Sequence, residues 1–220
     1  AINLKLLDLF VGEGKQAQIE INGQGGDDSL TVGDLTGSGV QSVVFSGGDG
    51  NDFLNGNGTT TPITADGGAG DDILIGGVGD DILIGGGGAD LLIGGGGNDI
   101  LLGGEGADLF GFDTGAAFNA ADIGTNVIQN FDSADRIVLD TTVFAALTSE
   151  IGGGLSASEF AIVNSAEEAA LSDALIVYGA NTGQLYYNQN GAEAGFGDGS
   201  QFATIEGAPT LDANSFVVQA

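Results

Sequence analysis

The feature that most constrains this chain is a nine-residue repeat in its middle. Five units follow one another without a break from Gly67 to Gly111, and each reads Gly-Gly-x-Gly-x-Asp-x-U-x, where U is a large apolar residue. The sixth position of each unit is an aspartate: Asp72, Asp81, Asp90, Asp99 and Asp108. A strict period of this kind indicates stacked units, each of which buries its apolar face only against its neighbours.

Further copies precede the uninterrupted run. Residues 47–55 (GGDGNDFLN) match the pattern well and carry Asp52 at the sixth position, whereas residues 23–31 (GQGGDDSLT) match it weakly and carry Asp28 there. Between 47–55 and the run lie residues 56–66 (GNGTTTPITAD). We interpret this segment as one degenerate unit with two inserted residues.

The residue types within a unit predict its conformation. The first six positions are rich in glycine, which accepts positive φ and allows a tight turn, and the last three form a short strand. Two units then make one coil with a strand on each side, and coils stack at about 4.8 Å, as strands do in a sheet. The eighth position points inward, so we expect a core stack of Leu54, Leu74, Leu83, Leu92, Leu101 and Phe110.

The repeated aspartates favour a bound cation. Units n and n+2 lie on the same side of the coil, which places Asp72 near Asp90, Asp81 near Asp99, and Asp90 near Asp108. Each like-charge pair costs roughly 3 kcal/mol at ~5 Å and an effective dielectric near 20. Hard carboxylate and carbonyl oxygens on flexible loops favour Ca²⁺ over Mg²⁺, and metal binding then becomes part of folding. The alternative is that Asp and Gly serve only as turn formers, which does not explain their strict phase.

The units resemble the RTX, or hemolysin-type calcium-binding, nonapeptide repeat. The resemblance implies a mainly β fold, a calcium-binding parallel β-roll, with several Ca²⁺ ions as cofactors. The expected metal-binding residues are the sixth-position aspartates, the first-position glycines with their carbonyls, and Asp49. They are Asp28, Asp52, Asp72, Asp81, Asp90, Asp99 and Asp108, together with Gly47, Gly67, Gly76, Gly85, Gly94 and Gly103.

Composition excludes several classes of function. The net charge is −28, with Lys5, Lys15 and Arg136 as the basic residues, which argues against nucleic acid and anionic membrane as partners and for bound cations. Acidity that serves only solubility remains the alternative. The chain has no Cys and no His, which excludes disulfides, zinc–thiolate sites and a Ser-His-Asp triad. No apolar stretch reaches the ~18 residues of a membrane span.

We do not expect an enzyme. Carboxylate pairs are abundant, so glycoside hydrolysis is not excluded by residue type. However, these carboxylates are committed to the loops, and the chain has no Trp that would mark a sugar-binding cluster.

The segments on either side of the repeats suggest three domains. Residues 1–46 read as an N-terminal β segment that extends the roll irregularly, residues 47–111 as the roll, and residues 112–220 as a C-terminal capping and secretion-signal domain. The stretches 16–23 and 40–48 alternate like strands, whereas 4–10 (LKLLDLF) is compatible with helix or strand.

Four segments of the C-terminal region have local patterns of their own. Residues 125–140 predict a strand, an acidic turn and a strand, and residues 174–191 predict a hairpin. Residues 155–160 and 165–173 carry N-cap-like serines and predict short helices. In the acidic turn and just after it, Asp132, Asp135 and Asp140 are either further calcium ligands or ordinary turn acids.

The tail also resembles the C-terminal region of RTX proteins that are exported by type I secretion. The motifs are VIQNFDSADRIVLD, ALIVYGANTGQLYYNQNG, GSQFATIEG and TLDANSFVV. The resemblance implies an uncleaved C-terminal export signal, the type I secretion machinery as a partner, and a secreted, extracellular or cell-surface location. Because the chain has no Met, we expect Ala1 to begin a processed or excised piece of a larger secreted protein.

Positions seven and nine face outward on such a roll, yet here they are mostly aliphatic. They include Ile73, Ile75, Ile82, Ile84, Leu91, Ile93, Ile100 and Leu102. The candidate covers for these faces are flanking segments, a second copy of the chain or an external surface, and we expect flanking segments to cover at least one face. The alternative function is therefore a cell-surface, matrix or lattice protein, S-layer-like or adhesin-like, that associates with itself through these faces.

Overall fold

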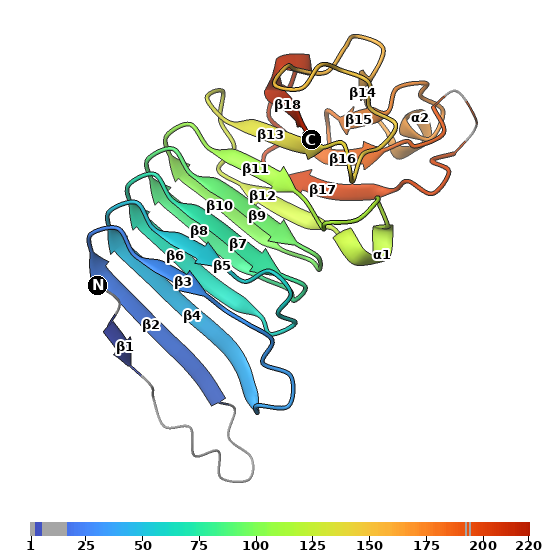
Figure 1. Cartoon of the computed structure of the whole chain (residues 1–220). Coiled ribbons are helices and arrows are strands. Elements are labelled where there is room, and N and C mark those ends of the chain that lie inside the picture. The colour runs from blue at the N-terminus through green and yellow to red at the C-terminus, as the bar shows by residue number, and fades with distance from the viewer. Residues whose placement is uncertain (1–2, 6–16, 192, 194) are drawn as a thin grey trace.

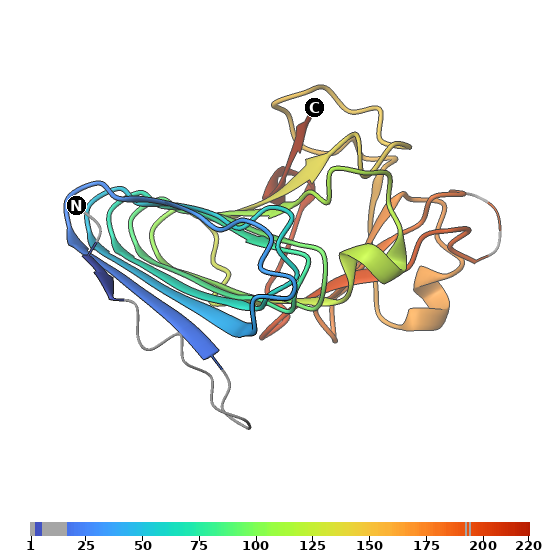
Figure 2. The ribbon, with the colours of Figure 1, turned by 60° about the horizontal axis from the view of Figure 1, so that its bottom comes forward.

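The computed structural model describes residues 3–5, 17–191, 193 and 195–220, and it shows a solenoid built from two sheets (Figure 1). The chain passes back and forth between an 11-stranded and a 7-stranded sheet. Figure 2 looks more nearly along the stack, where successive coils overlie one another as flattened rings. The predicted mainly β, parallel β-roll fold is confirmed.

Strands of the 11-stranded sheet follow in the spatial order β1 (Asn3–Lys5), β2 (Ala17–Gly25), β4 (Val40–Asp49), β6 (Ile63–Ala69), β8 (Ile82–Gly87), β10 (Ile100–Glu105), β12 (Asn126–Gln129), β17 (Gln201–Ile205), β16 (Gln184–Tyr187), β15 (Ile176–Gly179) and β14 (Phe160–Val163). The 7-stranded sheet has the order β18 (Phe216–Gln219), β13 (Arg136–Asp140), β11 (Leu109–Phe112), β9 (Leu91–Gly95), β7 (Ile73–Gly77), β5 (Phe53–Asn55) and β3 (Ser29–Thr31). Short helices are α1 (Ala120–Ile123), α2 (Ala166–Ala169) and the 3₁₀ turn Ala213–Ser215.

The eighth position of each repeat forms the core, as predicted. Strand register places Leu54, Leu74, Leu92 and Phe110 in one row and Leu83 beside Leu101 in the facing sheet. All six side chains are 0% exposed. The nine-residue period and the parallel pairing therefore agree, because one coil of two units returns each apolar position to the same place in the stack.

The degenerate unit 56–66 also keeps the register, as interpreted from the sequence. Thr64 pairs with Ile82, Ala65 with Leu83 and Asp66 with Ile84. These residues therefore hold the seventh, eighth and ninth positions. The two extra residues lie in the turn, and Ile63 takes the sixth position, which an aspartate holds elsewhere.

On the N-terminal side, the two sheets continue without a change of architecture. Strand β2 pairs in parallel with β4, and β3 pairs with β5 so that Leu30 lies beside Leu54. The strands predicted at 16–23 and 40–48 are thus present from Ala17 onward. Of the ambiguous stretch 4–10, residues 4 and 5 lie in β1, and the rest lies outside the described residues.

The C-terminal region continues the solenoid before it departs from it. Strands β12 and β13 add one coil, and β17 and β18 pair in parallel with them as the next layer. The predicted strand–turn–strand at 125–140 and the hairpin at 174–191 are confirmed, the latter as β15 and β16. The hairpin packs through aromatic contacts, and the ring centroids of Phe118 and Tyr187 are 4.9 Å apart.

One of the two predicted short helices is wrong. Ser165 caps α2 by accepting a hydrogen bond from the backbone of Glu168, as its sequence suggested. Residues 155–160 form a single turn instead, and Phe160 already begins β14. The cause is Glu159, whose buried carboxylate gathers donors from Thr148, Ser149 and Ser156 and holds the chain in a compact turn.

The apolar outer faces are covered in part. Residues 113–116 of the flanking segment line a cavity with Ile75, Val78 and Ile93 at one margin of the 7-stranded sheet. Four seventh-position side chains on the two sheets are exposed, namely Ile73 (39%), Ile82 (38%), Ile100 (36%) and Leu109 (37%). Among the helices of the described residues, none has the length and apolar character to cross a membrane.

A truncated side chain should cost more folding stability at an inward position of the core stack than at an outward position. We expect Leu83→Ala to lower the free energy of unfolding by about 2–5 kcal/mol, because it leaves a cavity between fixed strands. The matched control is Ile82→Ala, one residue earlier and 38% exposed, which should cost much less. Urea unfolding of both variants in saturating calcium measures the difference, and equal losses would contradict the inward and outward assignment.

The turn at Glu159 predicts a pH dependence. Burial acts to raise the pKa of Glu159, but hydrogen bonds from Ser149, Thr148 and Ser156 outweigh it and lower the pKa from 4.5 to about 2. A depressed pKa in the folded state gives stability that is present above pH ~4.5 and is lost as the pH falls toward 2.

We therefore expect Glu159→Gln to cost roughly 1.5–3 kcal/mol at pH 7, the range for a hydrogen-bonded charge. The difference between wild type and variant should shrink as the pH falls below ~4.5. Unfolding curves of both proteins over a pH series at fixed calcium test this. A difference that does not change with pH would show that the charge of Glu159 is not what holds the turn.

Candidate metal sites at the two edges of the roll

The glycine-rich turns line the two long edges of the roll. Edge one comprises the turns that lead from the 11-stranded to the 7-stranded sheet, at residues 23–28, 47–52, 67–72, 85–90, 103–108 and 130–135. Edge two comprises the turns that lead back, among them residues 56–63, 76–81 and 94–99. Every sixth-position aspartate therefore stands in a column of equivalent residues along one edge.

On edge one the sixth-position residues are joined into a continuous ladder. Each carboxylate after Asp28 accepts a hydrogen bond through Oδ1 from the backbone N–H of the sixth position in the preceding coil, at 2.6 to 3.0 Å. In order along the edge, the members are Asp28, Asp52, Asp72, Asp90, Asp108 and Asp135. The predicted stacking of Asp72 near Asp90 and of Asp90 near Asp108 is confirmed.

The ladder on edge two is shorter. The backbone N–H of Ile63 donates to Oδ1 of Asp81 at 2.7 Å, that of Asp81 to Asp99 at 2.9 Å, and that of Asp99 to Asn126 at 3.0 Å. The predicted neighbourhood of Asp81 and Asp99 is confirmed as well. This ladder begins on a residue without a carboxylate and ends on an amide.

A second ladder, which sequence reasoning missed, runs in the opposite direction through the fifth position. Oδ1 of Asp71 accepts from the N–H of Ala89 in the following coil at 2.8 Å, and Oδ1 of Asp80 accepts from Asn98 at 2.8 Å. Recurrent Asp or Asn at the fifth position was the available signal. Ala89 and Ala107 break the pattern on edge one because alanine has no acceptor.

The other carboxylate oxygen of the sixth position has a different environment. Oδ2 is buried and accepts no hydrogen bond from any described residue in Asp52, Asp72, Asp81, Asp90, Asp99 and Asp108. A buried polar atom without a partner carries a substantial free-energy cost, greater when it belongs to a charged group. This recurrent unpaired oxygen is what a hard cation would satisfy, so the donor set fits Ca²⁺.

Glycine carbonyls complete the surroundings of these oxygens. At Gly67 the hydrogen side of Cα faces Oδ2 of Asp72, and a Cβ there would also lie 2.8 Å from the carbonyl oxygen of Gly85 in the next coil. Gly85 repeats the arrangement with Asp90 and the carbonyl of Gly103, at 2.6 Å. A side chain at the first position would fill this place, which explains why the position is glycine.

Burial shifts the titration of these aspartates. Desolvation outweighs the backbone hydrogen bonds and raises the pKa of Asp72 and Asp90 to about 6, and that of Asp81 and Asp99 to about 7, from the usual 3.8. The same cause raises the pKa of Asp52 and Asp108. The fold therefore places negative charge where a cation, rather than solvent, has to stabilise it.

Asp49 differs from the other expected ligands. Asp49 is exposed at the third position of its unit, and its backbone carbonyl accepts from Gly26 at 2.6 Å. Within the described part of the chain, no three His, Cys, Asp or Glu side chains gather in a metal-binding group. Any metal site at these edges must therefore combine one or two carboxylates with backbone carbonyls.

Beyond the repeats, the acids hold turns. Both oxygens of Asp135 are used, because Oδ1 accepts from Asp108 and Oδ2 accepts from the N–H of Asp132 at 2.8 Å. Asp132 accepts from Ala134 at 2.6 Å, and Asp140 accepts from Thr142 at 2.7 Å. These contacts favour the turn-acid interpretation of the three residues.

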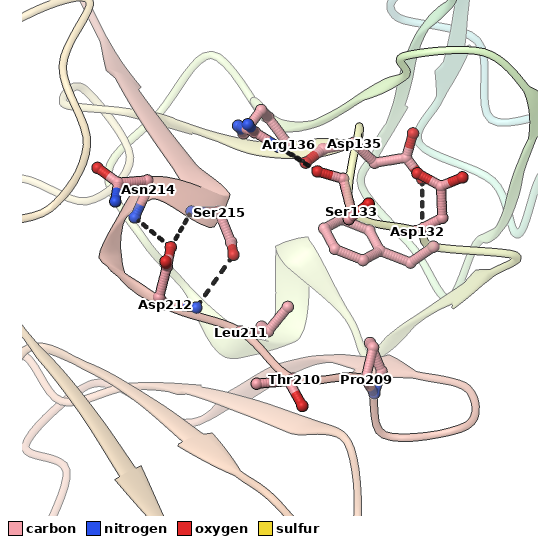
Figure 3. A pocket seen from close by; sticks show the side chains of 11 residues that line it. Asp132, Ser133, Asp135, Arg136, Pro209, Thr210, Leu211, Asp212, Asn214 and Ser215 are labelled. Atoms are coloured by element: carbon pink, nitrogen blue, oxygen red, sulfur yellow. Dashed lines mark hydrogen bonds between the residues drawn. The ribbon is translucent and has the colours of Figure 1, made fainter.

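A cavity of about 430 Å³ lies between the turn 130–135 and the segment 209–215 (Figure 3). Arg136 donates to the carbonyls of Ser133 and Asp135 there, and Asp212 accepts from the backbone of Asn214 and Ser215. Since its charged groups are engaged in local turns, we assign this cavity no ligand.

The two carboxylates within one turn allow a matched test. We expect Asp72→Asn to raise the calcium concentration at the midpoint of folding about tenfold or more, roughly 1.4 kcal/mol, because it removes the charge on Oδ2. The control is Asp71→Asn, which removes the same charge one residue earlier at an exposed position. Calcium titrations followed by circular dichroism compare them, and equal shifts would show that only net charge matters.

Comparison with known proteins identifies the repeats. The RTX calcium-binding nonapeptide repeat family (four copies) matches residues 43–59, 64–92 and 75–110. No curated protein gives a significant match. Among solved structures, the chain is similar to the AlgE6R3 subunit of the Azotobacter vinelandii mannuronan C5-epimerase, with 29% identity, a TM-score of 0.45, and coverage of 71% of this chain and 77% of that one. The repeats in residues 43–59 and 64–110 are thus RTX calcium-binding nonapeptide repeats.

Proposed function

We propose that this chain is a module that folds when Ca²⁺ binds between neighbouring coils at the edges of the roll. The ligands are the sixth-position aspartates Asp28, Asp52, Asp72, Asp81, Asp90, Asp99 and Asp108, with carbonyls of the first-position glycines Gly47, Gly67, Gly76, Gly85, Gly94 and Gly103 and a contribution from Asp49. The single observation that carries the proposal is the buried Oδ2 that accepts no hydrogen bond from any described residue in Asp52, Asp72, Asp81, Asp90, Asp99 and Asp108.

Calcium supplies positive charge where the fold has concentrated carboxylates. A Ca²⁺ site takes six to eight oxygen ligands in flexible geometry, which suits loops that offer few carboxylates and many carbonyls. Magnesium requires a small, strict octahedron, which these loops are not shaped to give. We assign the chain no catalytic residue of its own, because the carboxylates are committed to the ladders.

The ion count tests this proposal. We expect roughly four to eight Ca²⁺ per chain, in line with the number of repeats, and no comparable retention of Mg²⁺. Native mass spectrometry of the protein after dialysis against each metal gives both numbers. A chain that retains no calcium, or that holds magnesium equally well, would contradict the proposal.

We further propose that the module supports type I secretion of a larger protein. Residues 1–46 and 47–111 would form the roll, and residues 112–220 would cap it and carry the export signal. Coupled binding and folding supports this idea, because a roll that is unfolded at low cytosolic calcium can pass through a channel. It would then fold outside the cell, where roughly millimolar calcium suffices for extracellular modules.

Export is tested in cells that carry or lack a type I secretion system. We expect the full chain in the medium only when the channel is present, and retention after removal of residues 112–220. A second truncation that removes residues 47–111 but keeps the tail should still be exported. Export that depends on the repeats and not on the tail would contradict the assignment of the signal.

A second candidate function rests on the exposed aliphatic residues of the outer faces. Ile73 and Leu109 lie on the 7-stranded sheet, and Ile82 and Ile100 on the 11-stranded sheet, each 36–39% exposed. Such faces favour association of chains at a cell surface or in a lattice. Sedimentation in calcium at high concentration decides, because a strict monomer excludes self-association.

A further inference from the structure

We propose that the two edges of the roll hold calcium unequally. Edge one offers a continuous series of ion-binding steps between coils, whereas edge two contains one step, at Ile63, that apolar packing closes without an ion. This inference rests on the calcium function proposed above, and it adds which steps between coils carry ions.

One arrangement of oxygens recurs at five turns. The hydrogen side of the first-position glycine faces two oxygens, namely Oδ2 of the aspartate in its own turn and the carbonyl of the first-position glycine in the next coil. The glycines are Gly23, Gly47, Gly67 and Gly85 on edge one and Gly76 on edge two. The carboxylate oxygen of one turn and a carbonyl oxygen of the next coil therefore both lie close to the same glycine, where they are available to a cation that joins the two coils.

The step at Gly56 has only half of this arrangement. The carbonyl of Gly76 in the next coil lies against Gly56 as it does elsewhere. The second neighbour, however, is Cδ1 of Ile63, a methyl group where the other turns place a carboxylate oxygen. Ile63 holds the sixth position by register, is buried, and donates its N–H to Oδ1 of Asp81 like the aspartates of the ladder.

The turn of this unit also packs closely against the next coil. Thr59 is fully buried, and its carbonyl accepts from the N–H of Val78 in the next coil at 2.7 Å. A Cβ at Gly77 would lie 2.6 Å from the same carbonyl and 2.8 Å from that of Gly56. The carbonyls of Thr59 and Gly56 are therefore both packed against the backbone of the turn 76–81.

The turn 76–81 reflects this packing in its backbone. In the next turn of the same edge, 94–99, the second and fourth glycines, Gly95 and Gly97, have φ of 94° and 111°. Gly77 and Gly79 at the equivalent positions are not among the residues with positive φ. The face of this turn toward Ile63 thus departs from the shape that the other repeats share.

The arrangement of paired oxygens also stops toward the C-terminus. At Gly103 the ring of Phe110, rather than a carbonyl, lies beside Oδ2 of Asp108. The ladders then end on Asp135, whose two oxygens both accept hydrogen bonds, and on Asn126, whose amide donates to the carbonyls of Ile123 and Phe202. Edge one thus holds the longer series of candidate steps, and Ile63 interrupts edge two at its N-terminal side.

The test restores the missing carboxylate. We expect Ile63→Asp to bind one more Ca²⁺ per chain than wild type by native mass spectrometry in calcium. The matched control is Ile63→Asn, which has the same size and polarity without the charge and should bind the wild-type number. Circular dichroism in calcium verifies that both variants are folded. A folded Ile63→Asp that binds only the wild-type number would overturn the inference.

A measurement on the unaltered chain keeps the inference testable if the variants do not fold. Anomalous diffraction from crystals of the wild-type chain grown in calcium should show ions along edge one and none between the turns 56–63 and 76–81. An ion between these two turns would overturn the inference. Wild-type protein that binds no calcium at all would instead overturn the proposed function, so the two failures are distinguishable.

Discussion

The structure depends on the different roles of the two oxygens in each sixth-position carboxylate of the repeats. Oδ1 accepts a hydrogen bond from the backbone of the preceding coil, as Asp90 does from Asp72 at 2.8 Å, while Oδ2 stays buried and accepts none from any described residue. This holds for Asp52, Asp72, Asp81, Asp90, Asp99 and Asp108. The first contact fixes the register of the stack, and the second leaves charge that burial makes costly. Glycine at the first position follows from this, since a Cβ at Gly67 would overlap the carboxylate of Asp72.

The C-terminal region covers the strand edges at the end of the stack of repeats. A stack of coils ends in unpaired strand edges, which are a template for unwanted association. Here β17 and β18 pair with β12 and β13 and so cover the last coil. The antiparallel hairpin of β15 and β16 lies next to β17 in the 11-stranded sheet. The ladders end at the same level, on Asn126 and on Asp135, whose second oxygen is bonded to Asp132. The stack of parallel coils and the ladders of carboxylates thus end at the same place, which suits a region that we propose as the cap.

Much of this was readable from the sequence, because the nine-residue period fixes register and orientation at once. The inward stack from Leu54 to Phe110 and the neighbourhood of Asp72 and Asp90 follow from that period alone. The period does not reveal which oxygen of a carboxylate bonds, nor that the fifth-position ladder runs the other way. Outside the repeats only local signals remain. At residues 155–160 an N-cap-like serine predicted a helix, but the backbone of Ser156 donates to the buried carboxylate of Glu159 and the segment forms a turn before β14. The role of Ile63 required the register of β6 against β8.

The central claim is that a cation, and not packing alone, holds the coils together. Far-UV circular dichroism of the chain, titrated with calcium from EDTA and with magnesium as the control, tests it most directly. The account predicts a largely disordered chain in EDTA and a cooperative transition to β structure with calcium, absent with magnesium. A β-rich spectrum already present in EDTA would show that the apolar stack suffices, and it would contradict the account even if ions still bind.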